Sequence, residues 1–126
     1  MIEREIYQVL TGSTVITDLV GSNVFHHHLP DNHPLDENAI VFIINKDEGL
    51  DSLDGKNELE YHTLDIIVVD ADTIEIETIV SSLEDLLNEY DDNSIRDCEC
   101  TNVSPTMDAE KDQYIKKMTF NVIYDE

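Results

Sequence analysis

Apolar residues recur along this chain with two different periods, and the change of period predicts the order of its elements. Residues 2–10 carry an apolar stripe at helical spacing, and Gly12 interrupts it. Ser13 is a suitable N-cap for a second short helix, which Gly21 would end in a left-handed conformation. The first twenty residues therefore predict two consecutive helices.

The middle of the chain is built from runs that are typical of strands. A brief extended piece at Val24 and Phe25 leads into residues 29–38, a predicted loop with two prolines and several Asp and Asn residues. Residues 39–44 are apolar on both faces, as in a central strand, and residues 59–69 form the next strand. The polar connection between these two strands is too long for a simple hairpin. We expect it to become ordered only when the protein contacts other subunits.

A long helix and two further strands complete the predicted order. Asp72 and Glu75 resemble a capping box at the start of a helix that runs to about Tyr90. Its apolar stripe comprises Ile76, Ile79, Val80, Leu83, Leu86, Leu87 and Tyr90. Residues 95–103 suggest a polar edge strand and 107–112 a turn. In the last strand one face is apolar, made of Tyr114, Met118, Phe120, Val122 and Tyr124.

These elements predict the fold class α+β in the order α-α-β-β-α-β-β. Residues 1–126 are the right length for a single α+β domain with one core. Two hairpins separated by a long helix favour a four-stranded, largely antiparallel sheet with helices packed on one face.

Charge narrows the possible functions. The chain has 29 acidic and 7 basic residues, a formal net charge of −22. Such a surface repels nucleic acid and anionic lipid, so neither is an expected partner. The acidity has three possible explanations: solubility, a surface that DNA passes without sticking, or adaptation to high salt. No apolar run approaches the roughly 20 residues of a membrane span, and the N-terminus has no signal-peptide pattern, so synthesis in a cytoplasm is expected.

Histidines provide the best chemical candidates. His26, His28, Asp31 and His33 are ligand types that suit zinc or nickel, and in an extended segment His26 and His28 would share one face with His27 on the other. His62 and the cysteines are too distant in sequence to complete the set. We therefore interpret these residues as exposed loop histidines and predict no metal and no cofactor.

The two cysteines, Cys98 and Cys100, are predicted to lie on one face of a strand. Their Cα atoms would be about 6.6 Å apart, at the far end of the disulfide range. A Cys-x-Cys pair also supplies only two of the four ligands of a tetrahedral metal site. Reduced thiols, with one or both packed under the helix, are the favoured interpretation.

The connection between the first two core strands is the candidate assembly loop. Its candidate contact residues are Asp47, Glu48, Asp51, Asp54 and Lys56. The acidic members faintly suggest a calcium loop, but position 6, counted from Asp47, is Ser52 where an EF-hand needs glycine. A solvated loop is therefore expected, and the chain contains no phosphate loop, nucleophile elbow or zinc-protease motif.

The order and spacing of these elements resemble the tail-completion and tail-terminator proteins of tailed bacteriophages over nearly the whole chain. The resemblance lies in residues 6–10 and 16–21, the Val24–Phe25 piece with the prolines after it, the strand 40–44, the run 65–70 followed at once by a helix, and the strand 114–124. The chain departs from the family at Glu37-Asn38-Ala39, where a proline and an aromatic residue are common, and in its three consecutive histidines.

The resemblance implies a virion structural protein at the head–tail junction. Such subunits form a ring, usually hexameric, that caps the tail tube, ends its polymerisation and offers a docking surface to the head. The implied partners are copies of itself, the tail tube protein and a head-completion or connector protein, with DNA passing through unbound. The alternative is an acidic inhibitor or DNA mimic that binds a basic nuclease, although the carboxylates are spread over the chain. An enzyme ranks last.

Overall fold

A computed structural model of the chain describes residues 2–31, 37–46, 59–91, 94–108 and 113–125. These residues form three helices and six strands. The helices are α1 (Ile2–Gly12), α2 (Thr14–Val20) and α4 (Thr73–Leu87). The strands are β1 (Val24–His26), β2 (Ala39–Lys46), β3 (Leu59–Asp70), β4 (Ile95–Val103), β5 (Met107–Asp108) and β6 (Tyr114–Asp125). None of these helices has the length and apolar character needed to cross a membrane.

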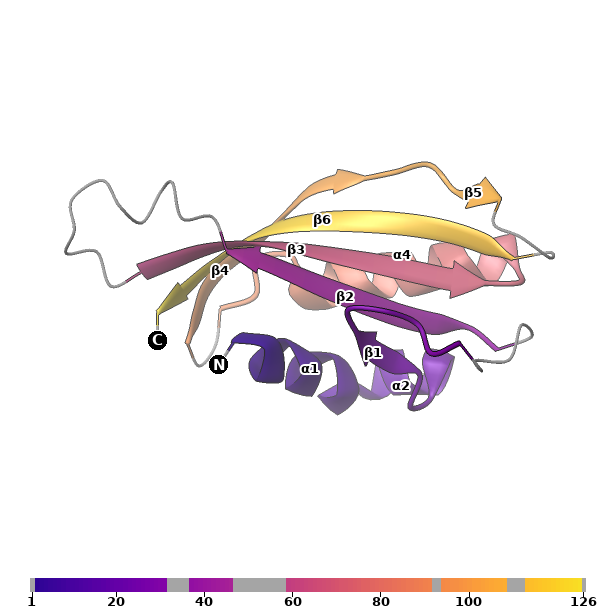
Figure 1. The fold of residues 1–126 in the computed structure, drawn as a ribbon, viewed down its shortest axis with the longest axis horizontal. Coiled ribbons are helices and arrows are strands. Elements are labelled where there is room, and N and C mark those ends of the chain that lie inside the picture. The colour runs from indigo at the N-terminus through magenta and orange to yellow at the C-terminus, as the bar shows by residue number, and fades with distance from the viewer. Residues whose placement is uncertain (1, 32–36, 47–58, 92–93, 109–112, 126) are drawn as a thin grey trace.

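The strands form one mixed sheet in the order β1-β2-β3-β6-β4, and β5 pairs with β6. The predicted antiparallel arrangement is confirmed for β2, β3, β6 and β4. The longest pairing is between β3 and β6, which are both central and run side by side across the molecule (Figure 1). The α+β class and the predicted element order therefore hold for the main strands.

Two short strands were missed, and they make the sheet mixed. The extended piece at residues 24–25 is strand β1, which pairs parallel with β2, so the sheet has more than the four predicted strands. The predicted turn at 107–112 begins with β5, which pairs with the start of β6. Strands of two or three residues are too short to show the alternation on which sequence patterns rest.

All three helices pack on one face of the sheet and enclose the core with it (Figure 1). The apolar stripes predicted for α1 and α4 are buried there, and so is the apolar face of β6. The two ends of the described chain are joined as well. The Tyr124 hydroxyl donates a hydrogen bond to Glu5 in α1, and the other Glu5 oxygen accepts from the Ser94 backbone N–H at 3.3 Å. In the part of the chain that the structure describes, the opposite face of the sheet carries no helix.

Both predicted helix caps are present, but the capping box is incomplete. Ser13 accepts a hydrogen bond from Ile16, and Asp72 accepts from the backbone N–H groups of Ile74 and Glu75. In a capping box Glu75 would return to the Asp72 N–H. Instead Asp70 Oδ1 accepts from that N–H at 2.9 Å, which leaves the Glu75 carboxyl for another partner.

The long helix ends at Leu87, three residues before the predicted end at Tyr90. Asn88 is the C-cap, and Glu89 has a positive φ of 65°, which helical backbone does not allow. Both residues contact β4: Asn88 Oδ1 accepts from the Cys100 N–H, and the Glu89 N–H donates to the Cys98 carbonyl. Tertiary hydrogen bonds therefore end the helix before its apolar pattern does.

Candidate functional site

The predicted assembly loop lies outside the described residues. This applies to Asp47, Glu48, Asp51, Asp54 and Lys56 alike. The described residues that flank it are Lys46 at the end of β2 and Leu59 at the start of β3. Lys46 Nζ lies 3.7 Å from Glu60 Oε2, so an ion pair links the two strands where the connection begins.

The histidine segment differs from the expected extended form. His26 ends β1 and its ring stacks on Phe42 at a centroid distance of 4.8 Å. His27 then has a positive φ of 76°, and its ring lies 3.9 Å from the ring of His26 instead of on the opposite face. The expected alternation of the three histidines is therefore wrong, because the left-handed turn at His27 ends the strand.

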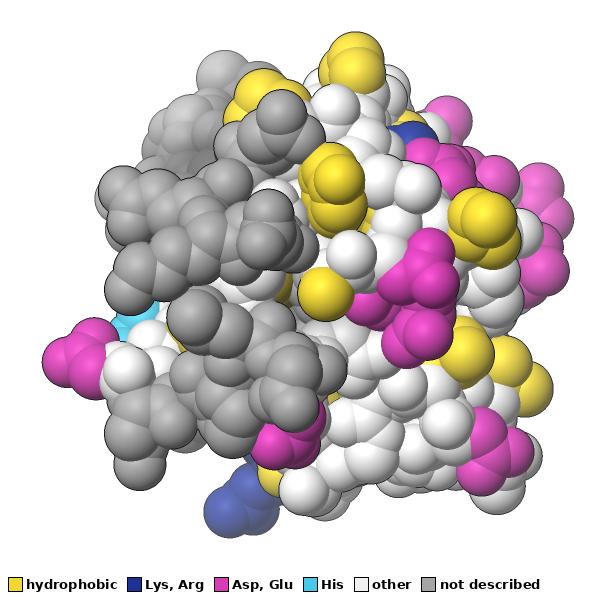
Figure 2. Space-filling model, turned by 90° about the vertical axis from the view of Figure 1, so that its right-hand side faces the viewer, with side chains coloured by type: hydrophobic (Ala, Val, Ile, Leu, Met, Phe, Trp, Pro, Cys, Tyr) yellow, Lys and Arg dark blue, Asp and Glu magenta, His cyan; other side chains and the backbone are white. Residues whose placement is uncertain are grey.

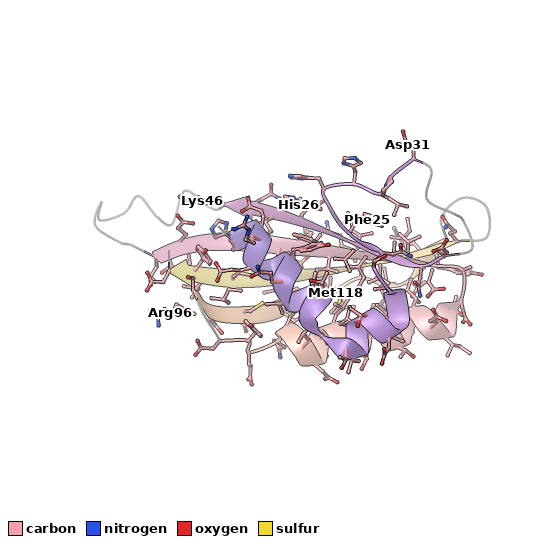
Figure 3. The ribbon with its side chains drawn as sticks, turned by 90° about the horizontal axis from the view of Figure 1, so that it is seen from below. Phe25, His26, Asp31, Lys46, Arg96 and Met118 are labelled. Carbon is pink, nitrogen blue, oxygen red and sulfur yellow. The ribbon has the colours of Figure 1, made fainter. Side chains whose placement is uncertain are left out.

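The surroundings of His26 favour a neutral ring. Its Nε2 atom is buried without a hydrogen-bond partner. Burial lowers the pKa of His26, the neighbouring His27 lowers it further, and Glu3 acts in the opposite direction. Asp31 points away from His26 (Figure 3), and His33 lies outside the described residues. No group of three His, Cys, Asp or Glu side chains in the described part of the chain is placed to hold a metal.

The two cysteines occupy the helix-covered face of the edge strand β4. Cys98 is buried in the core, and Cys100 is half-buried against it, as the alternating pattern predicted. Neither forms a disulfide. Burial raises the pKa of Cys98 to about 12, and the pKa of Cys100 is raised first by burial and then by Glu84. These thiols are therefore poor nucleophiles at neutral pH.

The face of the sheet opposite the described helices, called the uncovered face below, carries both polar and apolar side chains. At its centre Asp65 accepts a hydrogen bond from Thr119 at 2.9 Å and lies 3.8 Å from Lys117. Toward β4 the face has a shallow hollow of about 260 Å³. Its lining comprises Tyr61, His62, Thr63, Asp97, Glu99, Asn121, Val122 and Ile123. A mixed polar and apolar lining of this kind is compatible with contact with another protein.

A second open groove runs between α4 and the segment that leads into β5. Its floor is polar: Glu77 accepts from Lys116 Nζ at 2.6 Å and from Thr106 Oγ1 at 3.0 Å. Ile74 borders the groove and is 78% exposed, and Met107 beyond it is 59% exposed. This end of the molecule shows separate apolar patches with acidic side chains between them (Figure 2). Single exposed apolar side chains are common on protein surfaces, so Ile74 and Met107 are only candidates for a contact.

A cluster that sequence reasoning missed lies where β3 ends and α4 begins. The Asn38 amide Nδ2 lies 2.5 Å from Glu75 Oε1, 3.3 Å from Asp70 Oδ2 and 2.9 Å from the Leu19 carbonyl oxygen. Asp70 is only 5% exposed. The single sequence signal was an acidic residue at the end of an apolar strand, which is common and does not identify its partners.

The fold has a close match among solved structures. A protein chain from the virion of a native gene transfer agent particle superposes with a TM-score of 0.74, covering 96% of this chain and 92% of that one. The two sequences are 18% identical, so the match establishes a shared fold. No protein-family model and no curated protein matches the sequence.

Proposed function

We propose that this protein is a structural subunit of a phage-like virion, located at the tail end of the head–tail junction. The observation that carries the proposal is the shared fold with a chain of the gene transfer agent virion, over nearly the full length of both proteins. Tail-terminator proteins were the family that the sequence resembled. Two independent arguments, one from sequence order and one from three-dimensional structure, thus favour the same class of particle.

The proposed role is to form a ring that caps the tail tube, ends its polymerisation and presents a docking surface to the head. The tail tube protein and a head-completion or connector protein are the proposed partners, and the proposed ring is hexameric. A closed ring requires two different surfaces on each subunit, because head-to-tail contacts are heterologous. The uncovered sheet face and the groove beside α4 lie on different sides of the fold and suit such contacts.

The net charge of −22 supports a ring through which DNA passes. Phosphates and carboxylates repel each other, so an acidic bore would not retain DNA. In this proposal the protein is not an enzyme and needs no cofactor. The carboxylates of the described residues are spread over helices, strands and loops, which is unfavourable for the alternative of a DNA mimic with one phosphate-like row.

Deletion of the gene from a particle-producing strain tests the proposal. Electron micrographs should show tail tubes of irregular, excessive length and heads that lack tails, and a plasmid copy should restore joined particles. Mass spectrometry of purified wild-type particles should detect the protein, and a tagged copy should be seen at the head–tail junction. Normal particles from the deletion strain, together with capture of a basic nuclease by the purified protein, would favour the inhibitor alternative.

A further inference from the structure

One end of the molecule holds two carboxyl groups that share a single amide donor. Asn38 Nδ2 lies 3.3 Å from Asp70 Oδ2 and 2.5 Å from Glu75 Oε1, so both acids lie around one nitrogen atom. Asp70 is buried, and its other oxygen accepts from the Asp72 N–H at 2.9 Å. Two carboxylates this close repel strongly in a partly buried site unless one of them holds a proton.

Among the described residues, the charged groups that face this pair are acidic and offer no compensation. Asp70 at the end of β3 and Asp72 at the helix cap both face Glu75, and both are acidic. From the β2 side the neighbours are Asn38 and Glu37, and Glu37 accepts from the amide of Asn23. Lys116 extends from β6 toward α4, but it pairs with Glu77, two residues after Glu75 in the helix. With the described residues alone, protonation is therefore the way that remains to relieve the repulsion.

The cluster also joins segments that are far apart in the sequence. Asn38 donates to the carbonyl of Leu19 in α2, and its own carbonyl accepts from Asn23. Through Asp70 and Glu75 the same side chain is attached to the end of β3 and the first turn of α4. Whatever weakens the carboxyl pair therefore weakens the junction between the N-terminal helices, the start of β2 and α4.

We propose that Glu75 holds a proton that it donates to Asp70, and that the two side chains form, with Asn38, a pH-sensitive clasp between α2, β2 and α4. With the proton present, a Glu75 O–H donates to Asp70, and the other Glu75 oxygen accepts from Asn38. Loss of the proton leaves two carboxylates facing each other across one amide, and the clasp opens. The direction of the Glu75 pKa agrees: burial raises it first, followed by the charge and hydrogen bond of Asp70.

The sign of the pH dependence follows from the raised pKa. A group whose pKa is higher in the folded state contributes stability that is complete below its unfolded value, 4.5 for Glu75, and that is lost as pH rises through the folded value. The clasp therefore holds at low pH and loosens as pH rises through the raised pKa of Glu75.

Thermal unfolding of three full-length proteins between pH 5 and 9 tests this proposal. Glu75→Gln keeps both hydrogen bonds of the protonated form, since an amide NH₂ can donate to Asp70 and its carbonyl can accept from Asn38. Asp85→Asn is the control, because it removes one exposed carboxylate from the same helix. We expect Glu75→Gln to match the wild type near pH 5 and to exceed its Tm at pH 8.5 by several degrees, whereas Asp85→Asn shifts the whole profile evenly.

A Glu75→Gln protein that follows the wild-type profile at every pH, or that is less stable by a constant amount, would overturn the proposal. Carboxyl ¹³C NMR of the wild type is the second measurement and does not depend on how the variant folds. The Glu75 signal should titrate at a pH clearly above that of the exposed glutamates. Titration together with the exposed glutamates would equally overturn the proposal.

Discussion

Lys116 reaches from β6 to Glu77 on α4, and their charged atoms lie 2.6 Å apart although one side chain is nearly buried and the other is exposed. The Lys116 side chain is 12% exposed and that of Glu77 is 55% exposed. Among the described residues Glu77 is the ion-pair partner of Lys116, and a nearly buried ammonium without a partner is costly. The pair ties the helix layer to the sheet beside the open groove.

We expect Glu77→Gln to destabilise the protein by about 1 kcal/mol at pH 7, because Lys116 loses its charged partner while solvent limits the loss. Lys116→Met alone should cost less, and the double variant should show a favourable coupling in a denaturant-based double-mutant cycle. Hydrogen bonds from Lys116 and Thr106 lower the pKa of Glu77, so the effect should be complete above pH 4.5 and vanish as pH falls through the lowered value. Zero coupling at pH 7 would contradict this account.

His26 should make the protein sensitive to mild acid. Its pKa is lowered in the folded state, so the stability that the neutral ring contributes is complete above the ordinary value of 6.5 and is lost as pH falls through the folded value. His26→Phe should keep the stacking on Phe42 and remove this dependence. Tm measured at pH 7.5 and 5.5 should fall less for His26→Phe than for the wild type. His28→Asn, an exposed neighbour, is the control and should behave as the wild type.

The His26 effect and the proposed clasp have opposite signs. Acid weakens the packing around His26, whereas rising pH weakens the junction of Asp70 and Glu75. The wild-type profile therefore contains both contributions, and only the single variants separate them. If His26→Phe changed Tm only at high pH and Glu75→Gln changed it only at low pH, the roles assigned to His26 and Glu75 would both be wrong.

The two thiols should differ strongly in reactivity. Thiolate is the reactive form, and burial raises the pKa of Cys98 to about 12, while Cys100 is only half-buried. A colorimetric thiol reagent at pH 8 should modify Cys100 slowly and Cys98 only when the protein unfolds. In denaturant without reductant two thiols should be counted. Cys100→Ser should abolish the faster phase, and equal rates for both thiols would contradict the burial of Cys98.

The sequence predicted the parts of the fold that depend on local periodicity. The stripes of α1 and α4, the caps Ser13 and Asp72, and the alternation along β6 all follow from the spacing of residue types within one element. Antiparallel pairing was predicted within each of the two hairpins, β2 with β3 and β4 with β6, whereas the pairing of β3 with β6 was not predicted. Parallel pairing of β1 with β2 depends on the path of the loop between them, which no local pattern encodes.

The candidate sites were harder to predict, for the same physical reason. Asn38, just before β2, meets Asp70 of β3 and Glu75 of α4, which lie 32 and 37 residues further along the chain, and each residue type is common by itself. The local pattern predicted that Glu75 accepts from the Asp72 N–H, because an acid three residues after the cap is typical of a capping box. In the structure the Asp72 N–H donates to Asp70 instead, because the end of β3 places the Asp70 carboxylate beside the start of α4.

Assembly of the proposed ring should depend on the salt concentration. Each subunit has a net charge of −22, so identical copies repel one another. Exposed charges are screened beyond about 10 Å at 0.1 M salt and beyond about 3 Å at 1 M. If the contacts between subunits are mainly apolar and backbone in nature, we expect a monomer in dilute, low-salt buffer and rings at high salt, at high protein concentration or on tail tubes.

Light scattering across a salt series measures this change directly, and hydrogen exchange on both states should show greater protection of residues 46–58 in the ring. Ile74→Ser is a useful variant, because it removes an apolar side chain that is already exposed and should weaken association without lowering Tm. Rings that dissociate as salt rises would show that ion pairs between subunits dominate instead. A protein that stays monomeric at every salt and concentration, and also beside tail tubes, would contradict the ring, and the acidic inhibitor would then be the better explanation of the charge.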